Sequence, residues 1–288
     1  MNHTLLISVP QLQALQANGA PLMVFDCSFD LMKPDAGAQL YQDAHIPGAV
    51  YADLNTALSD KSHAVDSASG GRHPLPSRER FAAWLTRVGL RNDCQAVVYD
   101  RNGANYCGRL WWMLKWAGHD AVAVLDGGLQ AWQAAGGAVA QGLQTPTPAT
   151  SAFLLGTPLR KLTTTSTVAR ELGHPGQTLI DARGTPRFKG EVEPLDPVAG
   201  HIPGALNRPF NLNIGADGRF KPAQQLKAEF DALLGGRDPA TVVHHCGSGV
   251  SAVPNVIAME IAGLGQAALY AGSWSEWCNT PGLPVAQG

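Results

Sequence analysis

A cysteine with glycines one and three positions after it is the part of this sequence best suited to covalent chemistry. The segment reads Cys246-Gly247-Ser248-Gly249-Val250-Ser251. It follows an apolar run, residues 241–245, and precedes a stretch with helical apolar spacing, residues 250–263. A loop between a strand and a helix N-terminus gathers backbone N–H groups and the positive end of the helix dipole at one point. Cys246 is therefore predicted to have a lowered pKa and to act as a thiolate nucleophile, and the loop can also hold a persulfide.

Two other interpretations of this loop are disfavoured by the residues around it. Gly247 to Ala252 also fits the G-x-G-x-x-A pattern of dinucleotide-binding loops, but that site needs an acidic residue at the end of the next strand. The next apolar run ends Leu269-Tyr270-Ala271, without a carboxylate. A cysteine phosphatase needs an arginine after the loop to hold phosphate, and the sixth residue after Cys246 is Ala252.

The chain contains two copies of one sequence pattern. Residues 44–49 read AHIPGA and residues 200–205 read GHIPGA, an offset of 201 − 45 = 156 between their histidines. Upstream, Asp26 and Asp181 both end apolar runs, at an offset of 181 − 26 = 155. A repeat of this length is too long for a solenoid unit, so each copy is predicted to be a domain.

The duplication indicates which copy holds the chemistry. Further along the chain the offset is 145, which matches Trp132 to Trp277 and matches Arg101 to Cys246. The first copy has no nucleophile at that position and is predicted to be catalytically silent. His45 and His201 occur in both copies, which favours a structural role in the turn.

The apolar pattern predicts an α/β fold in both copies. Short apolar runs bounded by turn residues read as buried parallel strands; they are residues 22–26, 96–100, 121–126, 178–182, 241–245 and 267–271. Residues 77–90, 222–236 and 250–263 have helical apolar spacing. We therefore predict two tandem domains, 1–140 and 161–288, each a mainly parallel sheet flanked by helices. They are joined by a linker at 141–160 that includes Thr145-Pro146-Thr147-Pro148.

Composition excludes several classes of protein. The net charge is 21 − 23 = −2, Lys and Arg form no run, and 45% of residues are hydrophobic, which argues against disorder, nucleic-acid binding and membrane-surface binding. No apolar stretch approaches the roughly 20 residues of a membrane span, and no signal peptide is visible. Five cysteines without a C-x-x-C pair favour free thiols in the cytoplasm. No cofactor or metal site is predicted.

His244 and His245 are adjacent at the end of a predicted strand, so their side chains should point to opposite faces of the sheet. They are therefore not predicted to bind one metal ion together.

Taken together, the paired HIPGA segments, Asp181 with Arg183 and Arg187 after it, and the Cys246 loop resemble the two-domain rhodanese superfamily of sulfurtransferases over nearly the whole chain. The resemblance implies that Cys246 accepts sulfur as a persulfide. It also implies that Ser248 handles a proton at the donor with His73 as its partner. Arg187 matches the arginine that holds the donor carboxylate.

The same resemblance assigns the remaining site residues and the reaction. Arg183 and the loop residues are expected to line the donor site; the loop residues are Gly247, Gly249, Val250 and Ser251. The CGSGVS loop is similar to the CGSGVT loop usual in 3-mercaptopyruvate sulfurtransferases, whereas thiosulfate-preferring members usually carry CRKGVT. The implied reaction transfers sulfur from 3-mercaptopyruvate to cyanide or to a thiol acceptor, such as thioredoxin or a small thiol.

Two positions depart from the family pattern. Leu195 follows Glu193-Pro194, where the family has a second carboxylate-binding arginine. Asn55 stands where the family has the acid that completes the Ser–His arrangement. Two alternatives therefore stay open, a thiosulfate:cyanide sulfurtransferase and a non-catalytic persulfide carrier.

Overall fold

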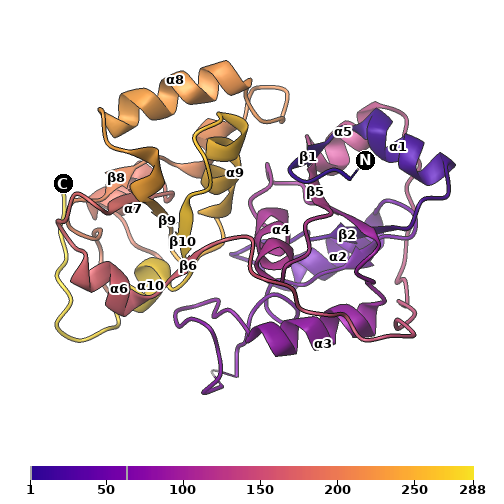
Figure 1. Ribbon diagram of the computed structural model, residues 1–288, viewed down its shortest axis with the longest axis horizontal. Coiled ribbons are helices and arrows are strands. Elements are labelled where there is room, and N and C mark those ends of the chain that lie inside the picture. Colours follow the sequence, from indigo (N-terminus) through magenta and orange to yellow (C-terminus); the bar gives the residue numbers. More distant parts are fainter. Residues whose placement is uncertain (1, 63) are drawn as a thin grey trace. The chain divides into compact units, whose positions relative to one another are not determined.

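The two copies of the pattern fold as two parallel sheets with helices around them (Figure 1). The computed structural model of the chain describes residues 2–62 and 64–288. It divides into two units: the first comprises Met1–Asp60, Pro76–Leu159 and Ala216–Phe220, and the second comprises Lys61–Leu75, Arg160–Gly215 and Lys221–Gly288. Residues 61–75 belong to the second unit by their contacts, although they precede most of the first unit in sequence.

The first unit contains a five-stranded sheet in the order β1-β5-β4-β2-β3, in which every neighbouring pair is parallel. Its strands are β1 (Leu6–Ile7), β2 (Leu22–Asp26), β3 (Val50–Tyr51), β4 (Gln95–Tyr99) and β5 (Val122–Leu125). Its helices are α1 (Val9–Ala17), α2 (Ala36–Asp43), α3 (Arg78–Val88), α4 (Cys107–Trp116) and α5 (Gly128–Ala134). Leu12 of α1 and Trp132 of α5 share one core cluster with Val24 and Val97 of the sheet.

The second unit repeats this arrangement, with the sheet order β6-β10-β9-β7-β8 and parallel pairing throughout. Its strands are β6 (Leu162–Thr163), β7 (Thr178–Asp181), β8 (Leu206–Asn207), β9 (Val242–His245) and β10 (Ala268–Tyr270). Its helices are α6 (Thr165–Arg170), α7 (Thr185–Lys189), α8 (Ala223–Leu234), α9 (Val253–Ile261) and α10 (Ser273–Trp277), with short 3₁₀ turns at Phe210–Asn213 and Pro239–Thr241.

Alternation along β9 assigns helices to the two faces of the second sheet. Val243 packs in one core cluster with Trp274 of α10, beside α6. The next residue, His244, faces the other side, where it contacts Met259 of α9 and lies edge-on to Phe230 of α8. Figure 1 shows α8 and α9 together on one side of these strands and α6 with α10 on the other.

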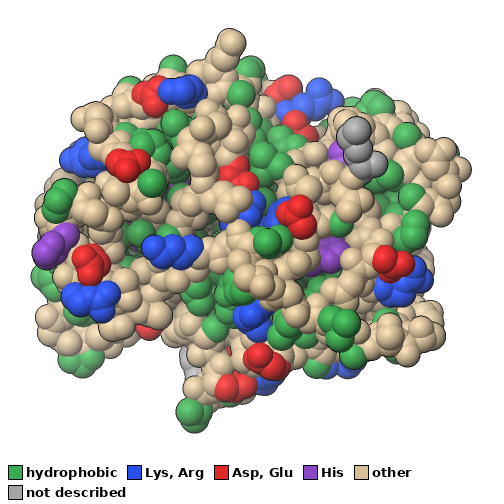
Figure 2. All heavy atoms as spheres, viewed as in Figure 1, with side chains coloured by type: hydrophobic (Ala, Val, Ile, Leu, Met, Phe, Trp, Pro, Cys, Tyr) green, Lys and Arg blue, Asp and Glu red, His purple; other side chains and the backbone are tan. Residues whose placement is uncertain are grey.

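The predicted α/β class is confirmed, with a parallel sheet flanked by helices in each unit. All six apolar runs form strands, and the three predicted helices begin and end within a few residues of their expected bounds. On the face drawn in Figure 2, acidic and basic side chains are interspersed, as the near-zero net charge leads one to expect. Among the described residues, every helix is too short or too polar to cross a bilayer.

Candidate active site at the carboxyl end of β9

Cys246 lies directly after β9, at the carboxyl end of a central strand, where parallel sheets gather their functional groups. Its side chain is buried, with an exposed fraction of 2%. The loop that it opens leads to α9 and is fastened to α10. The Cys246 N–H donates to Ser273 Oγ (3.1 Å), and its carbonyl accepts from the Trp274 N–H (2.9 Å). The backbone of Cys246 is therefore held by α10 directly after the end of β9.

The two glycines of the loop are required for different reasons. Gly249 has a φ of +73°, and a Cβ there would lie 2.2 Å from the carbonyl oxygen of Ala271. Any other residue would strain the backbone and collide with the neighbouring strand end. At Gly247, a Cβ would lie 3.0 Å from Arg72 Nη2 and 3.5 Å from Arg187 Nη1. The missing side chain at Gly247 leaves two guanidinium groups close to the backbone next to Cys246.

Ser248 and His73 are brought together in the second unit. His73 Nδ1 lies 2.7 Å from Ser248 Oγ, and both side chains are buried. His73 comes from the segment 61–75, whose Arg72 N–H donates to Ser275 Oγ (2.9 Å) in α10. A hydroxyl hydrogen-bonded to a buried imidazole can pass a proton in either direction. The structure thus places the Ser248–His73 hydrogen bond two residues along the chain from Cys246.

Arg187 is held near the loop by two carboxylates. It lies within α7, and its Nη2 pairs with Glu193 Oε1 (2.7 Å) and Asp196 Oδ2 (3.2 Å). The guanidinium keeps an exposed fraction of 20%, whereas both acids are nearly buried. Burial raises the pKa of Asp196, against the opposing effect of Arg72. Arg187 is therefore held beside the loop by Glu193 and Asp196, with part of its side chain open.

Arg183 lies deeper than Arg187 and is saturated with partners. Its Nε and Nη2 donate to Asp181, Nη2 also donates to the Gly200 carbonyl (2.7 Å), and Nη1 pairs with Glu193 (3.3 Å). Its guanidinium lies over the Trp274 ring, 4.7 Å from the centroid. These contacts are those of a buried structural ion pair that orients Glu193. The predicted contact of Arg183 with a donor stays a prediction.

The structure also describes Val250 and Ser251 of the Cys246 loop, and Leu195 beside Glu193. Val250 is buried and its carbonyl accepts from the Val253 N–H (3.1 Å), while Ser251 is half-buried. Leu195 is tied to Arg187's partner, because its N–H donates to Glu193 Oε1 (3.0 Å). Leu195 also lines a cavity of about 470 Å³ together with Arg72 and Asp196.

The first unit has an arginine at the position that Cys246 occupies in the second. Arg101, which occupies the position of Cys246, pairs with Asp26 and donates to the carbonyls of Leu40 and Ala44. In the second unit the matching aspartate and carbonyl, Asp181 and Gly200, are satisfied by Arg183 instead. The same buried carboxylate is thus neutralised from a different strand end.

The repeated histidines are structural. His45 Nδ1 lies 2.8 Å from the Tyr41 carbonyl and its ring stacks on Tyr41. His201 does the same with Phe188, at 2.8 Å and with stacked rings. This confirms the interpretation of the HIPGA histidines as turn residues. Asn55, in the first unit, donates its N–H to Asp53 Oδ1 (2.9 Å).

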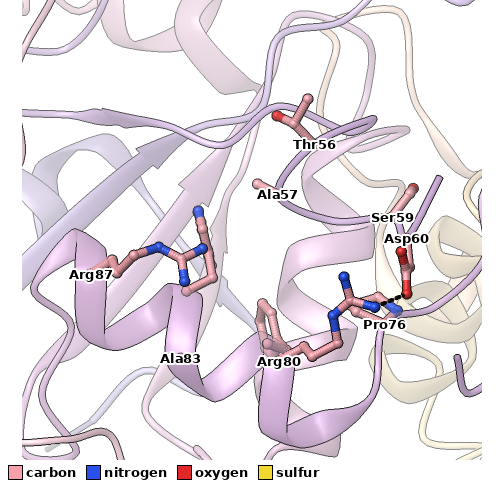
Figure 3. Close-up of a pocket in the computed structure, with 10 residues that line it drawn as sticks. Thr56, Ala57, Ser59, Asp60, Pro76, Arg80, Ala83 and Arg87 are labelled. Carbon is pink, nitrogen blue, oxygen red and sulfur yellow. Dashed lines mark hydrogen bonds and ion pairs between the residues drawn. The ribbon is translucent and has the colours of Figure 1, made fainter. Parts of the chain in front are cut away.

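The first unit has a separate cavity of about 230 Å³ beside α3 (Figure 3). Figure 3 shows Arg80 turned toward Asp60, with which it forms an ion pair, and Arg87 further along the same helix, α3. Neither cysteine nor histidine is among its lining residues. Within the described part of the chain, no group of three or more His, Cys, Asp or Glu side chains is placed to hold a metal ion.

His244 makes the stability of the protein depend on pH. Its ring is fully buried, and burial, assisted by the neighbouring His245, lowers its pKa to about 3. The unfolded chain binds a proton there below about pH 6.5, whereas the folded chain does not. The free energy of unfolding should therefore fall as the pH drops from 7 to 5, by about 2 kcal/mol from this residue alone.

Urea unfolding of the wild type and of His244→Leu at the two pH values measures this contribution. The variant should lose about 2 kcal/mol less than the wild type between pH 7 and pH 5, whatever its stability at pH 7. Equal losses in both proteins would show that His244 is not the residue responsible.

Comparison with known proteins agrees with this geometry. The rhodanese-like domain family matches residues 8–135 and again residues 164–280. A probable 3-mercaptopyruvate sulfurtransferase of Pseudomonas aeruginosa is 47% identical over 290 residues and covers all of both chains. A putative thiosulfate sulfurtransferase of Mycobacterium tuberculosis is 41% identical, over 98% of this chain and 97% of that protein.

Among solved structures, the 3-mercaptopyruvate sulfurtransferase from Leishmania major superposes with a TM-score of 0.79 at 30% identity, covering 95% of this chain and 74% of its own. The family match, the two parallel sheets and the full-length relatives lead to one conclusion. The chain belongs to the rhodanese family and carries two copies of its domain.

Proposed function

We propose that this protein is a sulfurtransferase that takes sulfur from 3-mercaptopyruvate, holds it as a persulfide on Cys246 and passes it to a thiol. The observation that carries the proposal is the loop of the second unit. It places a buried cysteine two residues from a Ser248–His73 hydrogen bond of 2.7 Å. Gly247 places the open guanidinium of Arg187 beside the same loop.

The first half of the reaction balances without a cofactor. The Cys246 thiolate attacks the sulfur of the donor, an S–S bond forms, and the donor's C–S bond breaks. The electron pair of that bond is left on the methylene carbon as the enolate of pyruvate. The proton of the donor thiol, passed through Ser248 with His73 as its partner, neutralises that carbon, and pyruvate leaves. Arg187 binds the donor carboxylate throughout, which orients the sulfur toward Cys246.

In the second half, a thiolate attacks the outer sulfur of the persulfide and Cys246 leaves as a thiolate. Thioredoxin, a small thiol or, in an assay, cyanide serves as the acceptor in this proposal. A cytoplasmic location belongs to the same proposal, because all five cysteines are free thiols and a reducing compartment supplies acceptor thiols.

Thiosulfate is the second candidate donor, favoured by the Mycobacterium tuberculosis relative's name. The loop sequence argues against it, since Gly247 and Ser248 stand where thiosulfate-preferring members usually carry Arg and Lys. A persulfide carrier, which receives its sulfur only from a protein partner, is the non-catalytic candidate.

The ratio of kcat/KM for the two donors, measured with cyanide as the common acceptor, separates these candidates. We expect 3-mercaptopyruvate to exceed thiosulfate by about tenfold or more, which corresponds to ~1.4 kcal/mol of transition-state stabilisation. The reverse ratio would assign thiosulfate as the donor. Turnover of neither donor would indicate the carrier.

A further inference from the structure

Arg72 occupies a position beside Cys246 that its role in the fold does not explain. Its backbone is held by two contacts of the surrounding segment. The Arg72 N–H donates to Ser275 Oγ (2.9 Å), and the Gly70 N–H donates to Glu276 Oε2 (3.1 Å). The Ser275 N–H in turn donates to the Gly247 carbonyl (2.9 Å). A chain of hydrogen bonds thus ties this segment to the loop through α10.

The side chain of Arg72 then turns toward the loop. Its Nη2 lies 3.0 Å from the position that a Cβ of Gly247 would take, and Arg187 Nη1 lies 3.5 Å from the same point. Two guanidinium groups from distant parts of the sequence therefore meet at the backbone next to the nucleophile.

Asp196 bridges these two groups. Its Oδ1 pairs with Arg72 Nη1 (2.7 Å), and its Oδ2 pairs with Arg187 Nη2 (3.2 Å). Within the described part of the chain, Arg72 Nη2 and Arg187 Nη1 donate to no acceptor. They are the two guanidinium nitrogens nearest the point that a Cβ of Gly247 would take; Arg187 Nη2, which is already paired with Glu193 and Asp196, lies 3.6 Å from it. Asp196 uses up one side of each guanidinium and leaves the other directed at the loop.

A small carboxylate fits the two remaining donors. A carboxylate with one oxygen on each of two guanidinium groups makes charge-assisted hydrogen bonds in the geometry that arginine favours. Leu195 lines the neighbouring cavity and offers only its backbone N–H, which is already bonded to Glu193. The second cation of the donor site is therefore not at position 195.

We infer that Arg72 binds the carboxylate of the sulfur donor together with Arg187, so that the segment 61–75 supplies the second arginine in place of Leu195. The inference rests on the proposed function, because it takes 3-mercaptopyruvate as the donor. Arg72 is a binding residue in this account, and Asp196 positions it.

Arg72→Gln removes the charge while keeping a long polar side chain. Loss of a charged hydrogen bond to the donor should lower the second-order rate constant for persulfide formation from 3-mercaptopyruvate by about 10- to 100-fold. Mercaptoacetone, which has a methyl group in place of the carboxylate, should react with the variant within about twofold of the wild-type rate. Single-turnover loading of Cys246, followed by intact mass, measures both constants. Arg170→Gln, an exposed arginine on α6, is the matched control.

A rescue variant tests the inference without the use of mercaptoacetone. With 3-mercaptopyruvate, the double variant Arg72→Gln/Leu195→Arg should react at least about tenfold faster than Arg72→Gln alone, since a guanidinium returns to the site. A purely structural role of Arg72 would not be repaired from position 195.

The outcomes separate this inference from the proposed function. Low activity of the wild type with 3-mercaptopyruvate overturns the proposed function itself. If the wild type is active, any of three results overturns the role of Arg72. They are an Arg72→Gln rate within about twofold of the wild-type rate, an equal loss of rate with 3-mercaptopyruvate and mercaptoacetone, and no rescue by Leu195→Arg.

Discussion

Replacement of Cys246 by serine is expected to lower kcat/KM for 3-mercaptopyruvate by about 10⁴-fold or more, because the variant loses the nucleophile of a covalent reaction. Serine fits the same buried place, since it differs by one atom, and so the fold should be kept. Its hydroxyl is not ionised near neutral pH and cannot store sulfur as a persulfide. Steady-state turnover with cyanide as acceptor measures the loss.

Cys278→Ser is the matched control for this experiment. Cys278 lies in the same unit, directly after α10, and burial raises the pKa of its thiol, which keeps it protonated and unreactive. The control should retain wild-type turnover. A Cys246→Ser protein with more than about a tenth of wild-type activity would place the nucleophile elsewhere.

Ser248→Ala is expected to reduce kcat with 3-mercaptopyruvate by about 10²-fold or more, the usual effect of losing a general acid–base group. The C–S bond of this donor leaves an electron pair on carbon, and that carbon must receive a proton. Thiosulfate releases sulfite instead, which leaves as a stable anion and needs no proton on carbon. The same variant should therefore change persulfide formation from thiosulfate by about threefold at most.

His73→Gln tests whether the two residues act as one unit. Because His73 Nδ1 and Ser248 Oγ are 2.7 Å apart, the double variant should be about as slow as the slower single variant. Additive losses would show that the two residues act independently. Equal losses with 3-mercaptopyruvate and thiosulfate would show that the pair supports the loop structure and does not move a proton.

The sequence was sufficient to predict the features that depend on periodicity. Six strands and the helices at 78–88, 223–234 and 253–261 follow from buried apolar patterns that local physics enforces. The placement of Cys246 follows from the same patterns, since a parallel strand end and a helix start must meet at that loop. The structural roles of His45 and His201 followed from their presence in both copies.

The features that sequence reasoning missed depend on long-range polar contacts. Residues 61–75 have no apolar period, so nothing local indicates that they pack on α10 of the second unit. No local pattern distinguishes Arg72 for the same reason, although it adjoins His73. Arg183 and Arg187 look alike in sequence, and only the buried partners of Arg183 distinguish the two.

The same limit applies to the exchange of arginines between the two units. Asp26 and Asp181 are matched in sequence, but Arg101 neutralises the first and Arg183 the second, from different strand ends. Alignment of the copies identifies the missing cysteine. It does not show that Arg101, at the matching position, pairs with the buried Asp26.

The most direct test is the intact mass of the protein after incubation with 3-mercaptopyruvate in the absence of an acceptor. The wild type should gain the mass of one sulfur atom, and fragmentation should locate that sulfur on Cys246. Addition of an acceptor thiol should then remove the added mass. Cys246→Ser should gain nothing. Sulfur gained by Cys246→Ser as readily as by the wild type, or sulfur located on another cysteine, would contradict the account.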